Sequence, residues 1–310
     1  MKITAPTAGD LAASVFAVPP LARKQDLSLD GDANRALIKH IETGGVSSLL
    51  YGGNANLYNM GLYEYAEMLD LVEDAAAVDT WVIPSAGPDF GKLMDQAAIL
   101  RGRPFPTAMV LPLSFPATSS GMAKGVRRFA HAYGKPVILY LKSESQLTIT
   151  DIAALVNDHL VCGIKYAIPR ANPAIDPFLR QLLDRIGPDL VVSGMAEVPA
   201  IVHMRDFGLR SFTSGGVCMA PRLATRLLRA IQDADFSLAD RCRAAFLPFE
   251  ALREKLGVFP TIHDAVTVSG VADMGAQLPM LDNLGPEAIA ELQPVIEALM
   301  AAERGLGSGV

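Results

Sequence analysis

Cysteine is scarce in this sequence, with three residues among 310, and the three lie far apart. Disulfide frameworks and CxxC metal clips need paired cysteines, so neither is predicted. We interpret Cys162, Cys218 and Cys242 as small, buried hydrophobic side chains. The five histidines are scattered too, with no HExxH pair, and no GxGxxG element or P-loop is present. The sequence therefore predicts no metal site and implies no nucleotide cofactor.

Clustered positive charge and long apolar stretches are also missing. The net charge is -6, and Arg127-Arg128 is too short a basic run to build a polyanion-binding surface, so nucleic acid is not an expected partner. No uncharged apolar stretch reaches the roughly 18 residues of a membrane span. The first residues do not resemble a signal peptide. We expect a cytoplasmic protein that does not bind membranes.

Hydrophobic residues make up 50% of the chain and follow a repeating order. Short β-rich apolar runs alternate with longer segments that can be helical, which gives eight β/α units. Strands apolar on both faces suit a parallel sheet covered by helices, and eight units in a row favour closure. The sequence predicts an α/β protein with a (β/α)₈ TIM barrel. The expected strands are Ser14–Val18, Val46–Leu50, Thr80–Ile83, Thr107–Leu111, Pro136–Leu141, Val161–Tyr166, Leu190–Ser193 and Gly208–Thr213.

The strand signals fade after Asp233. Helices are predicted over Leu238–Leu256, Thr261–Val268 and Pro286–Ala302, and Pro286 suits a first helical turn. We therefore divide the chain into a barrel, residues 1–233, and a C-terminal helical region packed on it, residues 234–310.

Two polar residues stand at the ends of predicted neighbouring strands, where a TIM barrel assembles its active site. Lys165 ends an apolar strand, and burial would lower its pKa toward the neutral amine that attacks a carbonyl. Tyr140 could transfer protons beside it. Considered by spacing alone, Lys165 could equally extend to the rim and pair with a carboxylate, and Tyr140 could be a packed core residue.

These two strands resemble the tyrosine and Schiff-base lysine strands of the dihydrodipicolinate synthase and N-acetylneuraminate lyase superfamily, whose members are class I aldolases. The similarity extends along most of the chain in order and approximate spacing. Its segments are Lys135–Tyr140, Gly163–Lys165, Val18-Pro19-Pro20, Gly44-Gly45-Val46 and Gln277–Met280. The resemblance implies that Lys165 forms a Schiff base with a 2-keto acid, that Tyr140 is catalytic, and that the protein is a homo-tetramer or homo-dimer.

Three departures from the family pattern limit the choice of substrate. The strand-two loop that binds the keto acid carboxylate in the family reads Gly53-Asn54-Ala55 here, so the relay hydroxyl is absent. Backbone amides of this loop could still bind a carboxylate, or the loop could be only a tight turn. Ser114 stands where synthases carry a relay tyrosine that reaches a neighbouring subunit. Lys142 stands near the position of their substrate-binding arginine, or is a surface charge.

Two further residues are candidate ligands of the substrate. Arg210, in the eighth predicted strand, could bind a carboxylate, although an ion pair with an acidic residue of the barrel would explain it as well. Gly215 lies in the small-residue loop Thr213–Gly216, which leaves room for a ligand or simply makes a turn.

The resemblance and the residues together predict a Schiff-base lyase of the aldolase type acting on pyruvate or a related 2-keto acid. The departures argue against true dihydrodipicolinate synthesis. The alternatives are a keto-acid sugar dehydratase with the same lysine, or a degenerate barrel that binds a keto acid without turnover.

Overall fold

A computed structural model describes residues 1–306 and contains eight parallel strands in one sheet, hydrogen-bonded in the order β7-β6-β5-β4-β3-β2-β1-β8. A parallel bridge between Ser193 and Phe212 joins the two ends of this order. The predicted (β/α)₈ barrel is therefore confirmed. The strands are β1 (Phe16–Ala17), β2 (Ser48–Tyr51), β3 (Trp81–Ala86), β4 (Met109–Val110), β5 (Val137–Leu141), β6 (Val161–Tyr166), β7 (Val191–Ser193) and β8 (Thr213–Ser214).

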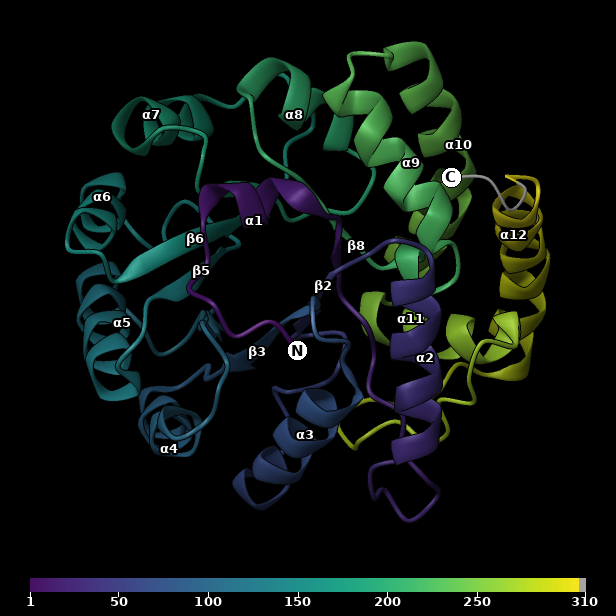
Figure 1. The fold of residues 1–310 in the computed structure, drawn as a ribbon, viewed down its shortest axis with the longest axis horizontal. Coiled ribbons are helices and arrows are strands. Elements are labelled where there is room, and N and C mark those ends of the chain that lie inside the picture. Colours follow the sequence, from purple (N-terminus) through teal and green to yellow (C-terminus); the bar gives the residue numbers. More distant parts are fainter. Residues whose placement is uncertain (307–310) are drawn as a thin grey trace.

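A ring of helices surrounds the strands (Figure 1). These helices are α2 (Gly31–Thr43), α3 (Leu62–Ala75), α4 (Phe90–Arg101), α5 (Ser119–Tyr133), α6 (Ile149–Asn157), α7 (Pro177–Ile186), α8 (Ala200–Phe207) and α9 (Pro221–Gln232), the last preceded by the 3₁₀ turn η1 (Gly216–Cys218). A short helix that the sequence pattern did not predict, α1 (Ala8–Ala13), lies across one end of the ring. Its Leu11 packs near Gly163 at the start of β6, so α1 covers the N-terminal end of the barrel.

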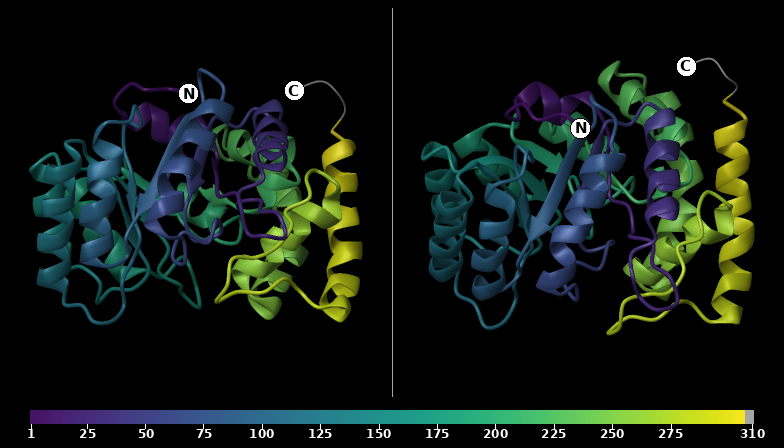
Figure 2. Two further views of the ribbon diagram at one scale, coloured as in Figure 1. Left: turned by 90° about the horizontal axis from the view of Figure 1, so that it is seen from below. Right: turned by 60° about the horizontal axis from the view of Figure 1, so that its bottom comes forward.

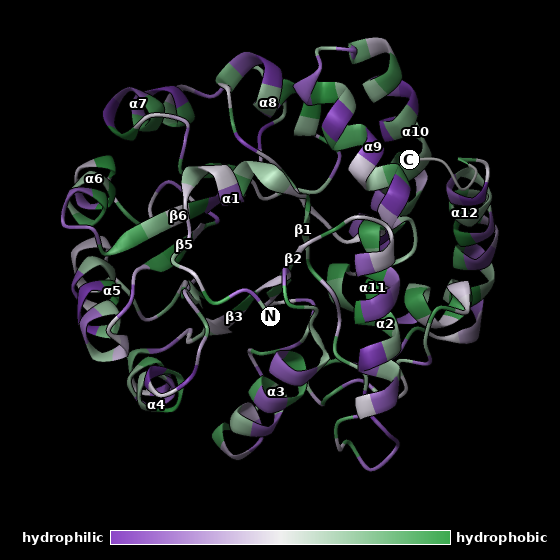
Figure 3. Cartoon of the chain, in the orientation of Figure 1, coloured by the Kyte–Doolittle hydropathy of each residue, from purple (hydrophilic) through white to green (hydrophobic). Residues whose placement is uncertain are grey.

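Local sequence signals explain where the helices begin and end. Thr118 caps α5 by accepting a hydrogen bond from the Gly121 N–H, and the helix ends at Gly134 in the left-handed conformation. Asp176 caps α7 in the same way and is followed by Pro177 at the first helical position. Hydrophilic and hydrophobic residues alternate around the outer helices, whereas the β6 ribbon is hydrophobic for most of its length (Figure 3). This pattern buries the strands beneath the helices.

Three helices follow the barrel: α10 (Phe236–Leu256), α11 (Val258–Ser269) and α12 (Pro286–Arg304), each close to its predicted position. They gather on one side of the molecule, where α12 forms the outer edge (Figure 2). The division of the chain at residue 233 remains a prediction, and residues 307–310 lie outside the described part. Within residues 1–306, no helix is long and apolar enough to cross a membrane.

The eighth strand differs from its prediction. It occupies only Thr213–Ser214, whereas the apolar pattern predicted a strand from Gly208 to Thr213. Residues 208–212 instead lead into the strand from the N-terminal end of the barrel. Among the cysteines, Cys218 and Cys242 are buried as predicted, but Cys162 is only partly buried.

Candidate active site

Lys165 lies near the C-terminal end of β6 and is only 7% exposed. Successive side chains of a strand point to opposite faces, so Lys165 and its neighbour Tyr166 face different ways. The Tyr166 hydroxyl donates to Asp176 Oδ2 at 2.6 Å, which ties the end of β6 to the start of α7. Gly194, just after β7, makes room for the lysine, because a Cβ atom there would lie 2.8 Å from Lys165 Cγ. The amine is thus held inside the barrel mouth.

Tyr140 stands beside Lys165, because β5 and β6 pair in parallel with these two residues in register. The Lys165 Nζ atom lies 4.3 Å from the centre of the Tyr140 ring. The Gln146 side chain donates to the Tyr140 carbonyl at 2.7 Å and so holds this end of β5. Within residues 1–306, the Tyr140 hydroxyl makes no hydrogen bond, which leaves it available to a ligand.

The surroundings favour the neutral form of both groups. Burial lowers the pKa of Lys165 to about 7, and the positive charges of Arg253 and Lys142 contribute in the same direction. Burial raises the pKa of Tyr140 to about 12, against a smaller opposite effect of Arg253. At neutral pH the site therefore combines a lysine with a large fraction of free amine and a phenol that keeps its proton. This is the pair needed to add an amine to a ketone with proton transfer.

The loop after β2 reaches the same end of the barrel. It folds into a turn in which Asn56 N–H donates to the Gly53 carbonyl at 2.9 Å. The Asn54 side chain donates to the Val18 carbonyl at 2.7 Å and ties the loop to the end of β1. In the described part of the chain, the backbone N–H groups of Asn54 and Ala55 have no acceptor. Both the turn and the backbone donors that could bind a carboxylate are therefore present.

Gly215 follows β8 and has a neighbour that the sequence did not suggest. A Cβ atom at this position would lie 3.0 Å from Nη1 of Arg253 and 2.8 Å from Ile262 Cδ1. Arg253 comes from α10, and only 7% of it is exposed. The absence of a side chain at Gly215 thus lets a buried arginine lie against the end of β8.

Arg210 is not part of this site, and its predicted role as a carboxylate ligand needs correction. It precedes β8 at the N-terminal end of the barrel, where its backbone N–H donates to the Val191 carbonyl. Its guanidinium is exposed and forms an ion pair with Asp189, which is the alternative considered above. The error follows from the misplaced eighth strand, since a residue before a parallel strand lies at the opposite rim from a residue after it.

A buried polar cluster adjoins the lysine and was missed by sequence reasoning. Glu197, in the loop between β7 and α8, is fully buried and accepts a hydrogen bond from the Ser214 hydroxyl. Burial raises the pKa of Glu197 to about 8, helped by the negative charge of Glu250, so this carboxyl is mostly protonated at pH 7. Arg253 and Glu250 complete the cluster from α10. These residues come from three separated segments, and no local pattern marks them.

Comparison with known proteins identifies the family. The sequence model of the dihydrodipicolinate synthetase family matches residues 12–299. The chain belongs to this family. Members of the dihydrodipicolinate synthetase family are enzymes of the class I aldolase and lyase type.

The proteins similar to this family member differ in their names and in their sequence identity to it. A protein of Rhizobium rhizogenes (strain K84), named as a probable 5-dehydro-4-deoxyglucarate dehydratase, is 27% identical over 260 residues, which cover 81% of this chain and 83% of the relative. The dihydrodipicolinate synthase of Bacillus clausii has a TM-score of 0.80 at 19% identity and covers 96% of this chain and 99% of its own. YagE, a family protein of E. coli K12 in complex with pyruvate, has a TM-score of 0.80 at 18% identity and covers 92% and 98%. The two solved structures support the fold.

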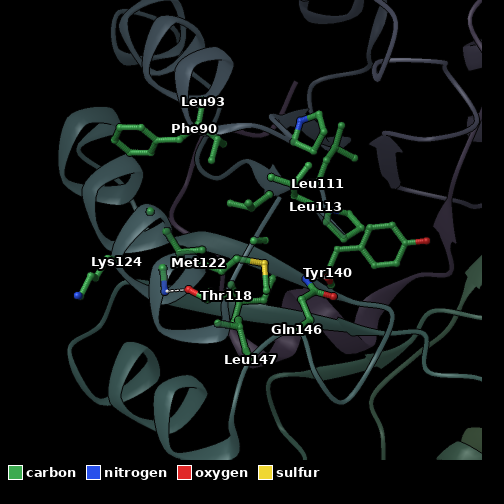
Figure 4. A pocket seen from close by; sticks show the side chains of 18 of the residues that line it. Phe90, Leu93, Leu111, Leu113, Thr118, Met122, Lys124, Tyr140, Gln146 and Leu147 are labelled. Carbon is green, nitrogen blue, oxygen red and sulfur yellow. Dashed lines mark hydrogen bonds between the residues drawn. The ribbon is translucent and has the colours of Figure 1, made fainter. Parts of the chain in front are cut away.

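In this family member a pocket of ≈ 760 Å³ lies between α4, α5 and the loop that joins β4 to α5. Its walls are mostly apolar, and Tyr140 stands at one end with its hydroxyl pointing away from Phe90, Leu93 and Met122 (Figure 4). Within residues 1–306, the residues that line this pocket do not include Lys165. The pocket therefore adjoins the candidate site without containing the amine. Within residues 1–306, no three potential His, Cys, Asp or Glu metal ligands gather in a group.

Proposed function

We propose that this protein is a Schiff-base lyase acting on a 2-keto acid. The observation that carries the proposal is Lys165, a buried amine with a pKa lowered to about 7, placed 4.3 Å from the ring of Tyr140. An ordinary surface lysine would be almost entirely protonated at neutral pH and a poor nucleophile. Membership of a family of class I lyases and aldolases supports the same chemistry.

The proposed reaction begins when the neutral Lys165 amine attacks the ketone carbon. The Tyr140 hydroxyl gives a proton to the carbonyl oxygen and takes one back from the attacking nitrogen, which forms the carbinolamine. It then gives a proton to the carbinolamine hydroxyl, which leaves as water, and the phenolate left behind balances the positive charge on the nitrogen. The product is an iminium ion, which withdraws electrons from the adjacent carbon. In this proposal the backbone N–H groups of Asn54 and Ala55, which have no acceptor within residues 1–306, bind the carboxylate next to the ketone.

Between the two lyase reactions, we favour the dehydratase over carbon–carbon cleavage. The Rhizobium rhizogenes relative is named for a 5-dehydro-4-deoxyglucarate, whose ketone lies next to a carboxylate and whose other end carries a second carboxylate. In such a substrate, the iminium permits loss of a proton from the adjacent carbon. Hydroxide then leaves the following carbon, and the proton and the hydroxide are released together as water. Buried Arg253, whose charge acts on Lys165, and buried Glu197 at the same rim of the barrel suit a polar substrate chain.

Aldol cleavage is the second candidate, since the family protein YagE has been solved with pyruvate. Product analysis separates the two reactions, because an aldolase releases pyruvate from a longer keto acid and a dehydratase does not. A protein that only binds would show a raised melting temperature with ligand and no product.

The test is borohydride reduction of the protein with pyruvate and with longer 2-keto acids, followed by intact and peptide mass spectrometry. We expect a stable adduct on Lys165 in the wild-type chain and in Lys142→Ala, but none in Lys165→Ala. Lys142 is a suitable control because it is exposed and lies 5.9 Å from the same tyrosine ring. Absence of an adduct on folded wild-type protein with every keto acid would refute the proposal.

We also propose that the chain forms a homo-oligomer, a tetramer or a dimer. Phe115, in the loop after β4, is 85% exposed beside the apolar pocket, which supports contact with another copy. Light scattering coupled to size-exclusion chromatography tests this, with Phe115→Ser expected to weaken the assembly. A monomer at all concentrations would contradict it. The cytoplasmic location stays a prediction from the sequence.

A further inference from the structure

Arg253 is an unusual residue to find beside the candidate lysine. Its guanidinium lies against Gly215 at the end of β8, on the same rim of the barrel as Lys165. The residue is more than nine-tenths buried, yet its Nε atom has no hydrogen-bond partner among the described residues. A buried, charged donor without a partner costs free energy, so such a group usually has a ligand or a water to bind.

The position of the guanidinium is set by its own helix. Arg253 Nη1 donates to both carboxylate oxygens of Glu250, at 2.9 and 3.0 Å, from one turn earlier on α10. The guanidinium carbon also lies 5.7 Å from the centre of the Phe249 ring. These contacts occupy one side of the guanidinium and leave the Nε side without a protein partner. A guanidinium has five donors in a planar fork and can bind one carboxylate on each of two edges.

A second unpartnered polar atom lies in the same cluster. Glu197 accepts from Ser214 with one carboxyl oxygen, while the other oxygen, Oε2, is buried and has no partner within residues 1–306. The Ser214 hydroxyl in turn accepts from the Val217 N–H at 2.9 Å, which fixes its orientation. A cationic donor and a carboxyl, both buried, therefore each have an atom without a partner within residues 1–306, at the same rim of the barrel as the candidate lysine.

We propose that Arg253 binds the distal carboxylate of a 2-keto dicarboxylic acid, with Glu197 contacting a polar group of the chain between the two ends. This inference rests on the proposed Schiff-base function. The substrate is then held at three points: its ketone carbon on Lys165, its near carboxylate at the loop of Asn54 and Ala55, and its far carboxylate on Arg253. The substrate class is a diacid rather than a monoacid.

The alternative hypothesis is that Arg253 and Glu250 form an ion pair that only stabilises the fold. An experiment can distinguish this structural role from substrate binding. A structural pair affects folding and acts equally on all ligands, whereas a substrate-binding arginine acts only on ligands that carry the second carboxylate.

The experiment measures half-saturation of borohydride trapping on Lys165 with two ligands of equal length, 2-oxoadipate and 2-oxohexanoate. The wild-type protein should prefer the diacid, and Arg253→Gln should lose this preference by about tenfold to a hundredfold, the usual effect of losing a charge-assisted hydrogen bond. Trapping is repeated at pH 7 and pH 9, because removing Arg253 also changes the charge near Lys165. The preference is a ratio between ligands and does not depend on that change.

The control is Arg241→Gln, which removes an exposed arginine from the same helix. It should keep the wild-type preference. If the wild-type protein traps both ligands equally well, the inference is wrong although the Schiff base is still supported. The same holds if Arg253→Gln keeps a wild-type preference for the diacid. If the wild-type protein traps neither ligand nor pyruvate, the proposed function itself fails. Arg253→Lys provides a second variant that keeps the charge, with a partial preference expected if Arg253→Gln does not fold.

Discussion

The lowered pKa of Lys165 makes a quantitative prediction about stability. A buried lysine whose pKa falls from 10.5 to about 7 on folding destabilises the folded state, because its protonated form loses its water. Since a tenfold change in proton affinity corresponds to about 1.4 kcal/mol, the free energy of unfolding is lowered by ~5 kcal/mol at acidic pH and by ~4 kcal/mol at pH 7. Methionine has a similar shape and no charge. We therefore expect Lys165→Met to raise the free energy of unfolding at pH 7 by about 2 to 4 kcal/mol, with imperfect packing accounting for the lower value.

The pH dependence of this gain has a definite sign. Between about pH 7 and 10.5 the unfolded chain keeps a proton on Lys165 that the folded chain has released. The stability of the wild-type protein therefore rises with pH through this window, while that of Lys165→Met lacks this contribution. By pH 10 this destabilisation has fallen below ~1 kcal/mol, because the lysine of the unfolded chain is then close to its own pKa of 10.5 and releasing its proton costs little.

The assay is urea unfolding at pH 7 and pH 10, followed by the fluorescence of Trp81, the only tryptophan and a buried one. Lys142→Met serves as the control, because this exposed lysine should change stability by no more than ~0.5 kcal/mol. A gain at Lys165 that is absent at pH 7, or equal at both pH values, would refute the argument that burial controls this amine.

Three further predictions concern two residues near Lys165 and one at the opposite rim of the barrel. Tyr140→Phe should lower turnover by about 10²- to 10⁴-fold, the usual contribution of a proton-transfer group, while an adduct on Lys165 still forms on borohydride reduction; unchanged turnover would remove Tyr140 from the mechanism. The raised pKa of Glu197 makes the folded wild-type protein hold a proton that the unfolded chain releases, so its stability should fall as pH rises from about 4.5 to 8. Glu197→Gln should lack this fall. Parallel pH profiles of unfolding for the two proteins would contradict the prediction. Arg210→Ala should cost at most ~1 kcal/mol in thermal unfolding and leave keto acid trapping unchanged, and a loss of trapping would return Arg210 to the site.

The Tyr140 and Lys165 pair could be predicted because its signal is local. Each residue ends a continuous apolar run, and successive strands of a barrel are neighbours, so two short segments were enough to bring the side chains together. The barrel itself followed from the alternation of such runs with helical segments. The lowered pKa of the lysine was expected for the same reason, since a charge at the end of an apolar strand loses its water.

Arg253, the arginine that we propose for the site, could not be found in this way, and Arg210, which the sequence suggested, lies at the opposite rim of the barrel. The eighth strand has only two residues, Thr213 and Ser214. The apolar stretch before it has the pattern of a strand, so the predicted strand begins five residues too early. Arg210 is therefore expected at the C-terminal rim, whereas it lies at the N-terminal rim. Arg253 lies in α10, which comes after the barrel in the chain, and its approach to Gly215 depends on how α10 packs against the barrel. Sequence alone determined most of the strands and the neighbouring positions of Tyr140 and Lys165, because strand periodicity and neighbouring order are local properties. Only the tertiary structure decided which charges surround that pair, because packing between distant segments leaves no periodic trace in the chain.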